Sequence, residues 1–341
     1  MVLEKLCNLN AVSGSEENVR EFILKNIRPY ADDIKIDIMG NVIAYVKGEC
    51  SDKKIMLAAH MDEVGLIVSK ITEDGYLKFK TVGGIDERIL PAKRVEVGEN
   101  KVCGVIGLKA IHLQTKAERE RVNSVSELVI DIGAKNYSQA AKMVSVGDYA
   151  SFKSVFSPIA DERCYKGKAL DDRCGCAVLI ELAKKRYFYD VYFAFTVQEE
   201  VGTRGAEICA NRIQPDAALV LEATTCSDVY GVKDYLEVTN LGGGAALSIK
   251  DNGSYSDVFL TKRLYALAKQ KNIAVQYKRT TAGGNDARVI QTAGQGVRTA
   301  ALSVPCRYLH SPIGIISKSD FEAVYMISKE FLQNADKILE E

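Results

Sequence analysis

The sequence lacks the features that mark several classes of protein. Lys and Arg together number 45, as do Asp and Glu, so the formal net charge is zero. Without a basic excess, the charge pattern does not favour nucleic acid or an anionic membrane as a partner. The chain also has no apolar run near the roughly 18 residues that a membrane helix needs, and its start has no basic region followed by an apolar core. We therefore expect neither secretion nor membrane insertion.

The cysteines do not form a recognisable framework. Nine are scattered along the chain, an odd number, and most of them lie within apolar segments. A secreted disulfide scaffold would show a different pattern, so a reducing cytoplasm is the expected location. Cys174 and Cys176 are close together, but no second pair completes a tetrahedral zinc set, and the sequence predicts small packing residues there.

What the sequence does contain is a change of pattern along its length. Residues 1–67 and 163–341 alternate helical and strand patterns, which is typical of an α/β layered domain. Residues 68–162 instead carry short strands punctuated by Gly. Because the apolar run at 55–59 belongs with the later sheet, we predict that 68–162 is a β-rich insertion in one α/β domain. Near the start, 13–27 predicts a capped amphipathic helix.

Acidic and imidazole side chains follow several predicted strands. His60 and Asp62 come directly after the run at 55–59, and they share one side because strand side chains alternate between faces. In an open α/β sheet, functional side chains collect just beyond the strand ends. The sequence therefore predicts one site, built from His60 and Asp62 together with Glu199 and Glu200 after the strand at 191–197, Glu222 within 217–223, His310 after 300–309, and Asp171 and Asp172 before a helix.

Two imidazoles and several carboxylates predict a metal site. These ligands suit zinc, and also cobalt or manganese, while the absence of Cys argues against a closed structural zinc site. Asp171, Glu200 and Glu222 bring three negative charges, which two divalent ions and one bridging hydroxide would balance. Such a hydroxide exists at neutral pH because metal coordination lowers the pKa of water from 15.7 to roughly 7. The sequence thus favours two catalytic ions over one.

Each of these residues also has a structural interpretation. Taken alone, His60 is more often a satisfied structural histidine, and a pair such as Glu199 and Glu200 is usually a solvated helix start. Asp172 is predicted to cap the helix that begins there. His112 lies inside the β-rich segment and is predicted to be structural.

A set of sequence segments, taken together, resembles that of a known family. In order along the chain, these segments include "VSGSEENVREFI", "IMLAAHMDEVGLIV", "VGGIDERILPAKRV", "KALDDRCG", "TVQEEVGTRGA", "LEATTCSDV", "GGNDARVIQ" and "RYLHSP". The resemblance is to the tetrahedral aminopeptidases, a family of co-catalytic metallopeptidases with glutamyl and deblocking members, some of which carry an endoglucanase label. It runs nearly end to end and implies a zinc-exopeptidase-like three-layer α/β/α catalytic domain with an inserted small PDZ-like or barrel domain.

The resemblance implies metal ligands at particular positions. His60, Asp171 and Glu222 would hold one ion, and Asp171, Glu200 and His310 the other, so that Asp171 bridges them. The sequence departs from the commoner family pattern at Glu222, where Asp is frequent. A longer side chain there still reaches a metal, although the spacing of that ion would differ.

The resemblance also implies roles for residues that bind no metal. Glu199 would be the general acid and base, beside the ligand Glu200. Asp62 would bond the other ring nitrogen of His60 and fix its tautomer. The peptide bond between Asp171 and Asp172 would be cis.

The expected function is that of a cytoplasmic aminopeptidase acting on short peptides through a metal-bridged hydroxide. The resemblance further implies dimers that assemble into a dodecamer, helped by the β-rich module. One alternative is an endoglucanase-type glycosidase, but that mechanism needs two carboxyl groups about 5 to 10 Å apart across one bond, which the adjacent Glu199 and Glu200 suit poorly. Another alternative is a degenerate binding or scaffold protein, against which the intact set of ionisable residues argues.

Overall fold

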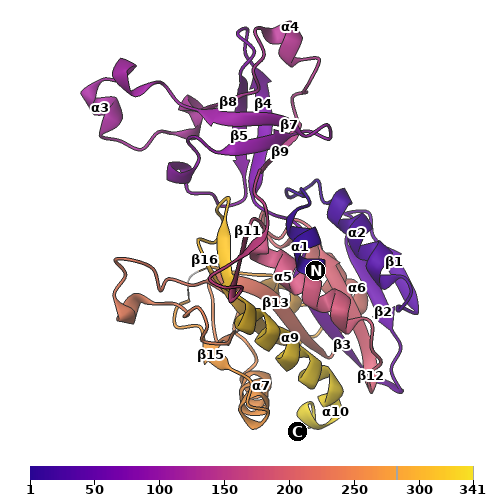
Figure 1. Cartoon of the computed structure of the whole chain (residues 1–341). Coiled ribbons are helices and arrows are strands. Elements are labelled where there is room, and N and C mark those ends of the chain that lie inside the picture. Colours follow the sequence, from indigo (N-terminus) through magenta and orange to yellow (C-terminus); the bar gives the residue numbers. More distant parts are fainter. Residues whose placement is uncertain (282, 341) are drawn as a thin grey trace.

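The computed structural model describes residues 1–281 and 283–340, which form a large mixed sheet with helices on both faces and a closed barrel (Figure 1). The four central strands of the sheet, β12, β3, β13 and β16, are parallel to one another. β2 pairs antiparallel with β12 on one side of this group, and β17 pairs antiparallel with β16 on the other. The order of strands across the sheet is β1 (Asp33–Ile36), β2 (Val42–Val46), β12 (Tyr189–Thr196), β3 (Cys50–His60), β13 (Ala217–Thr225), β16 (Arg298–Arg307), β17 (Gly314–Ser317), β11 (Cys164–Gly167) and β10 (Ser157–Ile159), with β14 (Ala245–Ser248) and β15 (Val275–Tyr277) joined through β16.

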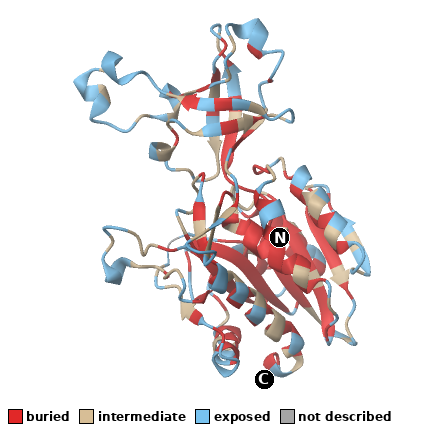
Figure 2. Ribbon diagram, in the orientation of Figure 1, coloured by how far each residue is buried: buried red, intermediate tan, exposed pale blue. Residues whose placement is uncertain are grey.

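The central strands are buried on both faces, as Figure 2 shows. Side chains alternate along a strand, so Ile55 and Leu57 of β3 enter one apolar core, while Met56 and Ala58 enter the other. The two layers of helices confirm the predicted three-layer α/β/α domain. The first core is covered by α1 (Val2–Cys7), α2 (Glu17–Ile27), α5 (Leu170–Leu182), α7 (Val258–Gln270), α9 (Lys318–Gln333) and α10 (Ala335–Ile338), and the second by α6 (Arg204–Ile213) and α8 (Ala287–Ile290).

The predicted β-rich module is a closed barrel with an apolar core of its own. β10 falls within the 68–162 segment yet pairs with β11, so the chain rejoins the large sheet before residue 162. None of the helices in the described ranges has the length and hydrophobicity to cross a bilayer. The barrel is formed by β4 (Gly65–Ile71), β5 (Leu77–Val82), β8 (Val129–Asp131), β7 (Val102–Gly107), β6 (Arg94–Val97) and β9 (Tyr149–Phe152), and its connections carry α3 (Lys116–Arg119) and α4 (Tyr137–Ala140).

The helix predicted within 13–27 forms as α2, with Val19 and Ile23 on its buried face. The predicted side-chain cap is wrong, however. Glu16 occupies the N-cap position but makes no capping hydrogen bond within the described chain. Its carboxylate instead accepts the N–H groups of Gly14 at 2.7 Å and of Gln198 at 3.3 Å. A tertiary partner has therefore replaced the local one.

A buried ion cluster fastens the first residues of the chain to the start of α5. Glu63 Oε1 lies 2.5 Å from Lys168 Nζ and 3.6 Å from Arg173 Nη2, and all three side chains are buried. Lys168 Nζ donates to the carbonyl oxygen of Leu9 at 2.9 Å, and Arg173 Nη1 donates to that of Leu6 at 2.7 Å. Both cations thus hold the N-terminal segment, and Glu63 supplies a negative charge close to both of them.

We expect Glu63→Ala to lower the free energy of unfolding by about 3 to 5 kcal/mol, because it leaves buried cations without their counter-charge. Urea denaturation at neutral pH measures the change. Glu181→Ala is the matched control: its carboxylate pairs with Lys184 at 2.7 Å on the surface, and such exposed pairs contribute about 0 to 1 kcal/mol. Equal losses in the two variants would contradict the assigned role of Glu63.

Candidate metal centre

The parallel strands bring the predicted site residues to one edge of the sheet. His60 is the last residue of β3 and lies in register with Thr196, the last residue of β12, so Glu199 and Glu200 follow close to it. Glu222 lies near the end of the adjacent β13. The carboxyl ends of parallel strands meet at the same edge, which is where ligand sites form in open α/β sheets.

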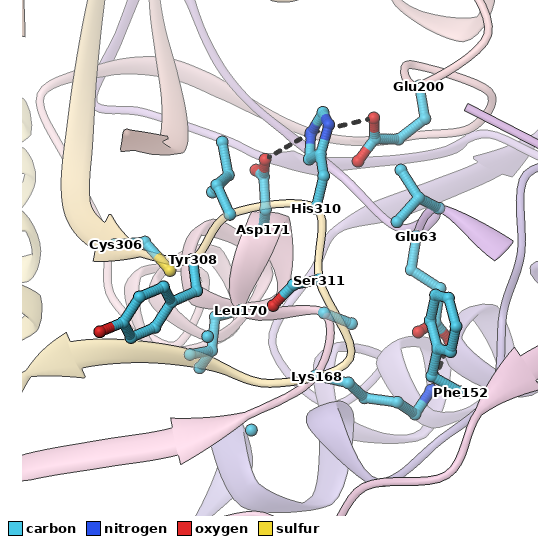
Figure 3. Close-up of a pocket in the computed structure, with 15 residues that line it drawn as sticks. Glu63, Phe152, Lys168, Leu170, Asp171, Glu200, Cys306, Tyr308, His310 and Ser311 are labelled. Carbon is cyan, nitrogen blue, oxygen red and sulfur yellow. Dashed lines mark hydrogen bonds and ion pairs between the residues drawn. The ribbon is translucent and has the colours of Figure 1, made fainter. Parts of the chain in front are cut away.

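Asp171 lies at the centre of the cluster. Its Oδ1 is 3.3 Å from His60 Nε2, and its Oδ2 is 3.5 Å from His310 Nε2. His60 Nε2 is also 3.6 Å from Glu222 Oε2, and His310 Nε2 is 3.3 Å from Glu200 Oε2. Figure 3 shows His310 between Asp171 and Glu200. The structure therefore brings together all five residues predicted as metal ligands, in two groups that share Asp171.

Both imidazoles are oriented by backbone carbonyl groups. His60 Nδ1 lies 3.1 Å from the carbonyl oxygen of Asp62, and His310 Nδ1 lies 2.9 Å from that of Gly84. A carbonyl oxygen can only accept, so each Nδ1 carries a proton, and each Nε2 faces carboxylate oxygens. That arrangement repels unless a proton or a cation lies between the atoms. It is also how proteins usually orient histidines that bind metal.

Negative charge is in excess at this site. Burial raises the pKa of Glu200 to about 7, and it also raises the pKa of Glu199 and of Glu222 well above its ordinary value. Burial alone would lower the pKa of His310, but Asp171 and Glu200 raise it to about 9. The glutamates are therefore hindered from carrying their negative charge, and His310 is favoured in its protonated form. Divalent cations would remove this conflict.

The donor atoms fit metal ions in geometry as well as in charge. Ligand atoms of His60, Asp171 and Glu200 lie within 4.8 Å of one another, and so do those of Asp171, Asp172 and Glu222. Glu222 Oε1 is buried and has no hydrogen-bond partner among residues 1–281 and 283–340. Carboxylate oxygens together with imidazole nitrogens are the donor set expected of zinc, cobalt or manganese.

Asp62 does more than the predicted orientation of His60. Its Oδ1 is 3.4 Å from His60 Nδ1, somewhat farther than its own carbonyl oxygen. The same carboxylate accepts the N–H groups of Glu199 and Glu200, each at 3.1 Å, and the hydroxyl of Ser13 at 2.6 Å. Asp62 therefore positions the turn after β12 as well as the imidazole.

Two buried aspartates near the cluster have incomplete hydrogen bonding. Asp172 accepts the N–H of Gly175 at 2.8 Å, which agrees with the predicted cap, and the peptide bond before it is cis, as the resemblance implies. Asp286, which sequence reasoning missed, accepts the hydroxyl of Thr196 at 2.6 Å. One carboxylate oxygen of each aspartate has no partner in the part of the chain that the structure describes. The sequence signal for Asp286 was its place in the segment "GGNDARVIQ", residues 283–291, which is among those that carry the family resemblance.

The cluster lines two cavities. The larger, of about 250 Å³, is bounded by Asp171, Glu199 and Glu222 on one side and by Gly283 and Asn285 on the other. The smaller, of about 20 Å³, lies on the other side of His310 and extends toward Lys168 and Ser311 (Figure 3). It has room for about one water molecule. The larger cavity is therefore the one that can admit a substrate.

Comparison with known proteins decides the family. The model of the M42 glutamyl aminopeptidase family matches residues 40–327. The chain belongs to the M42 family. The resemblance seen in the sequence is thereby confirmed, and the cluster described above is the metal-binding candidate of an M42 protein.

Several relatives are similar to this M42 chain over nearly its whole length. A putative aminopeptidase of Acetivibrio thermocellus is 39% identical over 94% of each chain. An aminopeptidase of Desulfurococcus kamchatkensis has a TM-score of 0.94 and 36% identity, covering 99% of this chain and 95% of its own.

Two further solved structures bear on assembly and on the alternative function. The TET1 peptidase of Pyrococcus horikoshii, which can assemble into a tetrahedron or a large octahedral shell, has a TM-score of 0.86 and 35% identity over 97% of this chain and 98% of its own. A Thermotoga maritima protein named as an endoglucanase has a TM-score of 0.82 and 36% identity over 98% of each chain. The endoglucanase label thus occurs beside aminopeptidases on the same fold.

Proposed function

We propose that this M42 protein is a metal-dependent aminopeptidase that holds two divalent ions, with zinc expected first and cobalt or manganese as alternatives, and that removes N-terminal residues from short peptides. One observation carries the proposal: His60 and His310 face the two oxygens of Asp171, and each imidazole also faces a second carboxylate, that of Glu222 or of Glu200. The family match supports the reaction class.

The residues divide into two ligand sets. His60, Asp171 and Glu222 would hold one ion, and Asp171, Glu200 and His310 the other. Asp171 is the shared ligand because each of its oxygens faces a different imidazole. Bound there, the ions would supply an acidified water and an electrophile for the scissile carbonyl.

Glu199 would carry the proton. It lines the larger cavity together with Asp171 and Glu222, and Asp62 holds its backbone N–H at 3.1 Å. From this position its carboxylate can take a proton from the attacking water and deliver it to the amine that leaves. Proton transfer of this kind typically contributes about 10² to 10⁴ in rate.

The barrel would serve assembly. We place the inserted module at about 68–162 and propose that dimers of this chain build a dodecamer, since the similar TET1 peptidase of P. horikoshii assembles into closed shells. Closed symmetric assemblies are the usual form of homo-oligomers. Mass photometry of the purified chain measures the assembly directly.

A chelator experiment tests the proposal against its alternatives. The purified chain is assayed on a panel of amino-acid p-nitroanilides and on soluble cellulose, before and after treatment with a chelator. We expect hydrolysis of p-nitroanilides that falls to background with the chelator and returns when zinc or cobalt is added, because the ions generate the nucleophile. Circular dichroism of the chelated protein verifies that it stays folded. Sugar release that the chelator leaves unchanged would overturn the proposal, as would a complete lack of peptidase activity.

A further inference from the structure

The turn that follows β12 has an unusual pattern of backbone hydrogen bonds. β12 ends at Thr196, and the next four residues, 197–200, contain Glu199 and Glu200. The N–H groups of all four are accepted by side chains. Asn41 Oδ1 accepts Val197 N–H at 2.9 Å, Glu16 Oε1 accepts Gln198 N–H at 3.3 Å, and Asp62 accepts the other two. Three side chains that are distant in sequence therefore fix the path of the turn.

The carbonyl groups of the same turn are bonded locally. Gly202 and Thr203 each donate an N–H to the carbonyl oxygen of Glu199 at 2.9 Å, and Gly205 donates to that of Val197 at 3.0 Å. Local backbone N–H groups thus bond the carbonyl groups of the turn, whereas side chains from elsewhere in the chain accept its N–H groups. Gln198, between the strand and Glu199, has φ of 57°. A non-glycine residue in that region is strained and needs support from its surroundings.

Glu16 gives that support at Gln198. Its side chain is 2% exposed and lies at the N-cap position of α2 without capping the helix. The carboxylate bonds Gly14 and Gln198 and lies next to Asp62, which holds the next two N–H groups. Burial raises the pKa of Glu16 to about 7, because the charged form of the carboxyl group is less stable there. A residue that only capped the helix could remain exposed and avoid this cost.

We propose that Glu16 is a positioning residue of the hydrolytic reaction: by fixing the N–H of Gln198 it sets the direction in which Glu199 enters the cavity. This inference rests on the proposed role of Glu199. It assigns to the N-terminal segment a part in the chemistry, although Glu16 itself touches neither the cavity nor the ligand set given above.

The test compares Glu16→Ala, Glu16→Gln and Glu17→Ala in the full chain loaded with zinc. Glu17 is the matched control, because it is the neighbouring residue, is largely exposed and pairs with Arg20 at 3.3 Å, away from the turn after β12. For Glu16→Ala we expect kcat on a p-nitroanilide to fall about tenfold to a hundredfold, the effect of a small misplacement of a reacting group. KM should change less than twofold and bound zinc should stay the same. Glu16→Gln should regain most of the activity, since its amide oxygen can accept both N–H groups, and Glu17→Ala should behave as the unmodified chain.

Hydrogen exchange gives a readout that does not depend on activity. In Glu16→Ala, deuterium uptake of the peptide covering 197–203 should rise while uptake of the central strands stays unchanged. The inference is overturned if Glu16→Ala keeps its kcat, if kcat falls only together with bound zinc, or if Glu16→Gln is as impaired as Glu16→Ala. An unmodified chain without peptidase activity would instead show that the proposed function is wrong.

Discussion

Replacing Glu199 with Gln is expected to lower kcat on peptide substrates by about 10² to 10⁴, the usual contribution of a positioned proton carrier. Gln has the same length and can occupy the same place in the cavity, but its amide cannot take up a proton at the operating pH. The backbone of residue 199 would stay in place, because the Asp62 carboxylate binds its N–H. Steady-state kinetics combined with metal analysis measures the effect, and bound metal should equal that of the unmodified chain.

Glu200→Gln is the matched comparison. The two residues are adjacent and Asp62 holds both N–H groups at 3.1 Å, but Glu200 Oε2 faces His310 at 3.3 Å, as a ligand would. This variant should lose activity together with bound metal. If Glu199→Gln keeps its activity within tenfold, or loses metal as Glu200→Gln does, then Glu199 is not the proton carrier.

The part of the site that follows from strand order could be predicted from the sequence. His60, Glu199 and Glu222 come at or just after the ends of three apolar runs, and parallel strands place such residues at one edge. The barrel was likewise predictable as a module, because Gly interrupts its short strands. These signals are local in the chain: a periodicity, a strand end and a change of composition.

The rest of the site depends on contacts that leave no local signal. The segment 13–27 was predicted to form a capped helix, yet the Glu16 carboxylate at its N-cap position bonds Gln198, 182 positions away. His310 is oriented by the carbonyl oxygen of Gly84, 226 positions away. Every residue has a carbonyl group, so no sequence pattern marks the one that is used. Tertiary structure alone decides which polar groups meet in such cases.

Asp62 makes both kinds of contact, one local in sequence and the others tertiary. The resemblance implied that its side chain would bond the other ring nitrogen of His60, and the nearer partner of that nitrogen is the backbone carbonyl of Asp62 at 3.1 Å. The carboxylate, however, is turned mainly to the turn after β12 and to Ser13. Asp62 therefore links the proposed ligand His60 with Glu199, which would carry the proton, and with the proposed ligand Glu200.

Asp171→Ala is expected to abolish the binding of both metal ions, whereas Glu222→Ala should remove only one. The two oxygens of the Asp171 carboxylate face the two imidazoles separately, at 3.3 Å from His60 Nε2 and 3.5 Å from His310 Nε2. Its removal takes a ligand from each ion and leaves both imidazoles beside unbalanced charge. Glu222 faces His60 at 3.6 Å, and the second group of Asp171, Glu200 and His310 stays complete without it.

Elemental analysis after dialysis against a small excess of zinc distinguishes the two variants. The unmodified chain should retain two ions per subunit, Glu222→Ala one and Asp171→Ala none, and activity should be lost in both because the paired ions act as a unit in such sites. Asp228→Ala is the control: its carboxylate pairs with Arg307 at 2.8 Å outside the cluster, so its metal content should not change. One ion retained by Asp171→Ala would show that the aspartate does not bridge. Two ions retained by Glu222→Ala would remove Glu222 from the ligand set, and the larger cavity would then be bounded by a carboxylate with some other task.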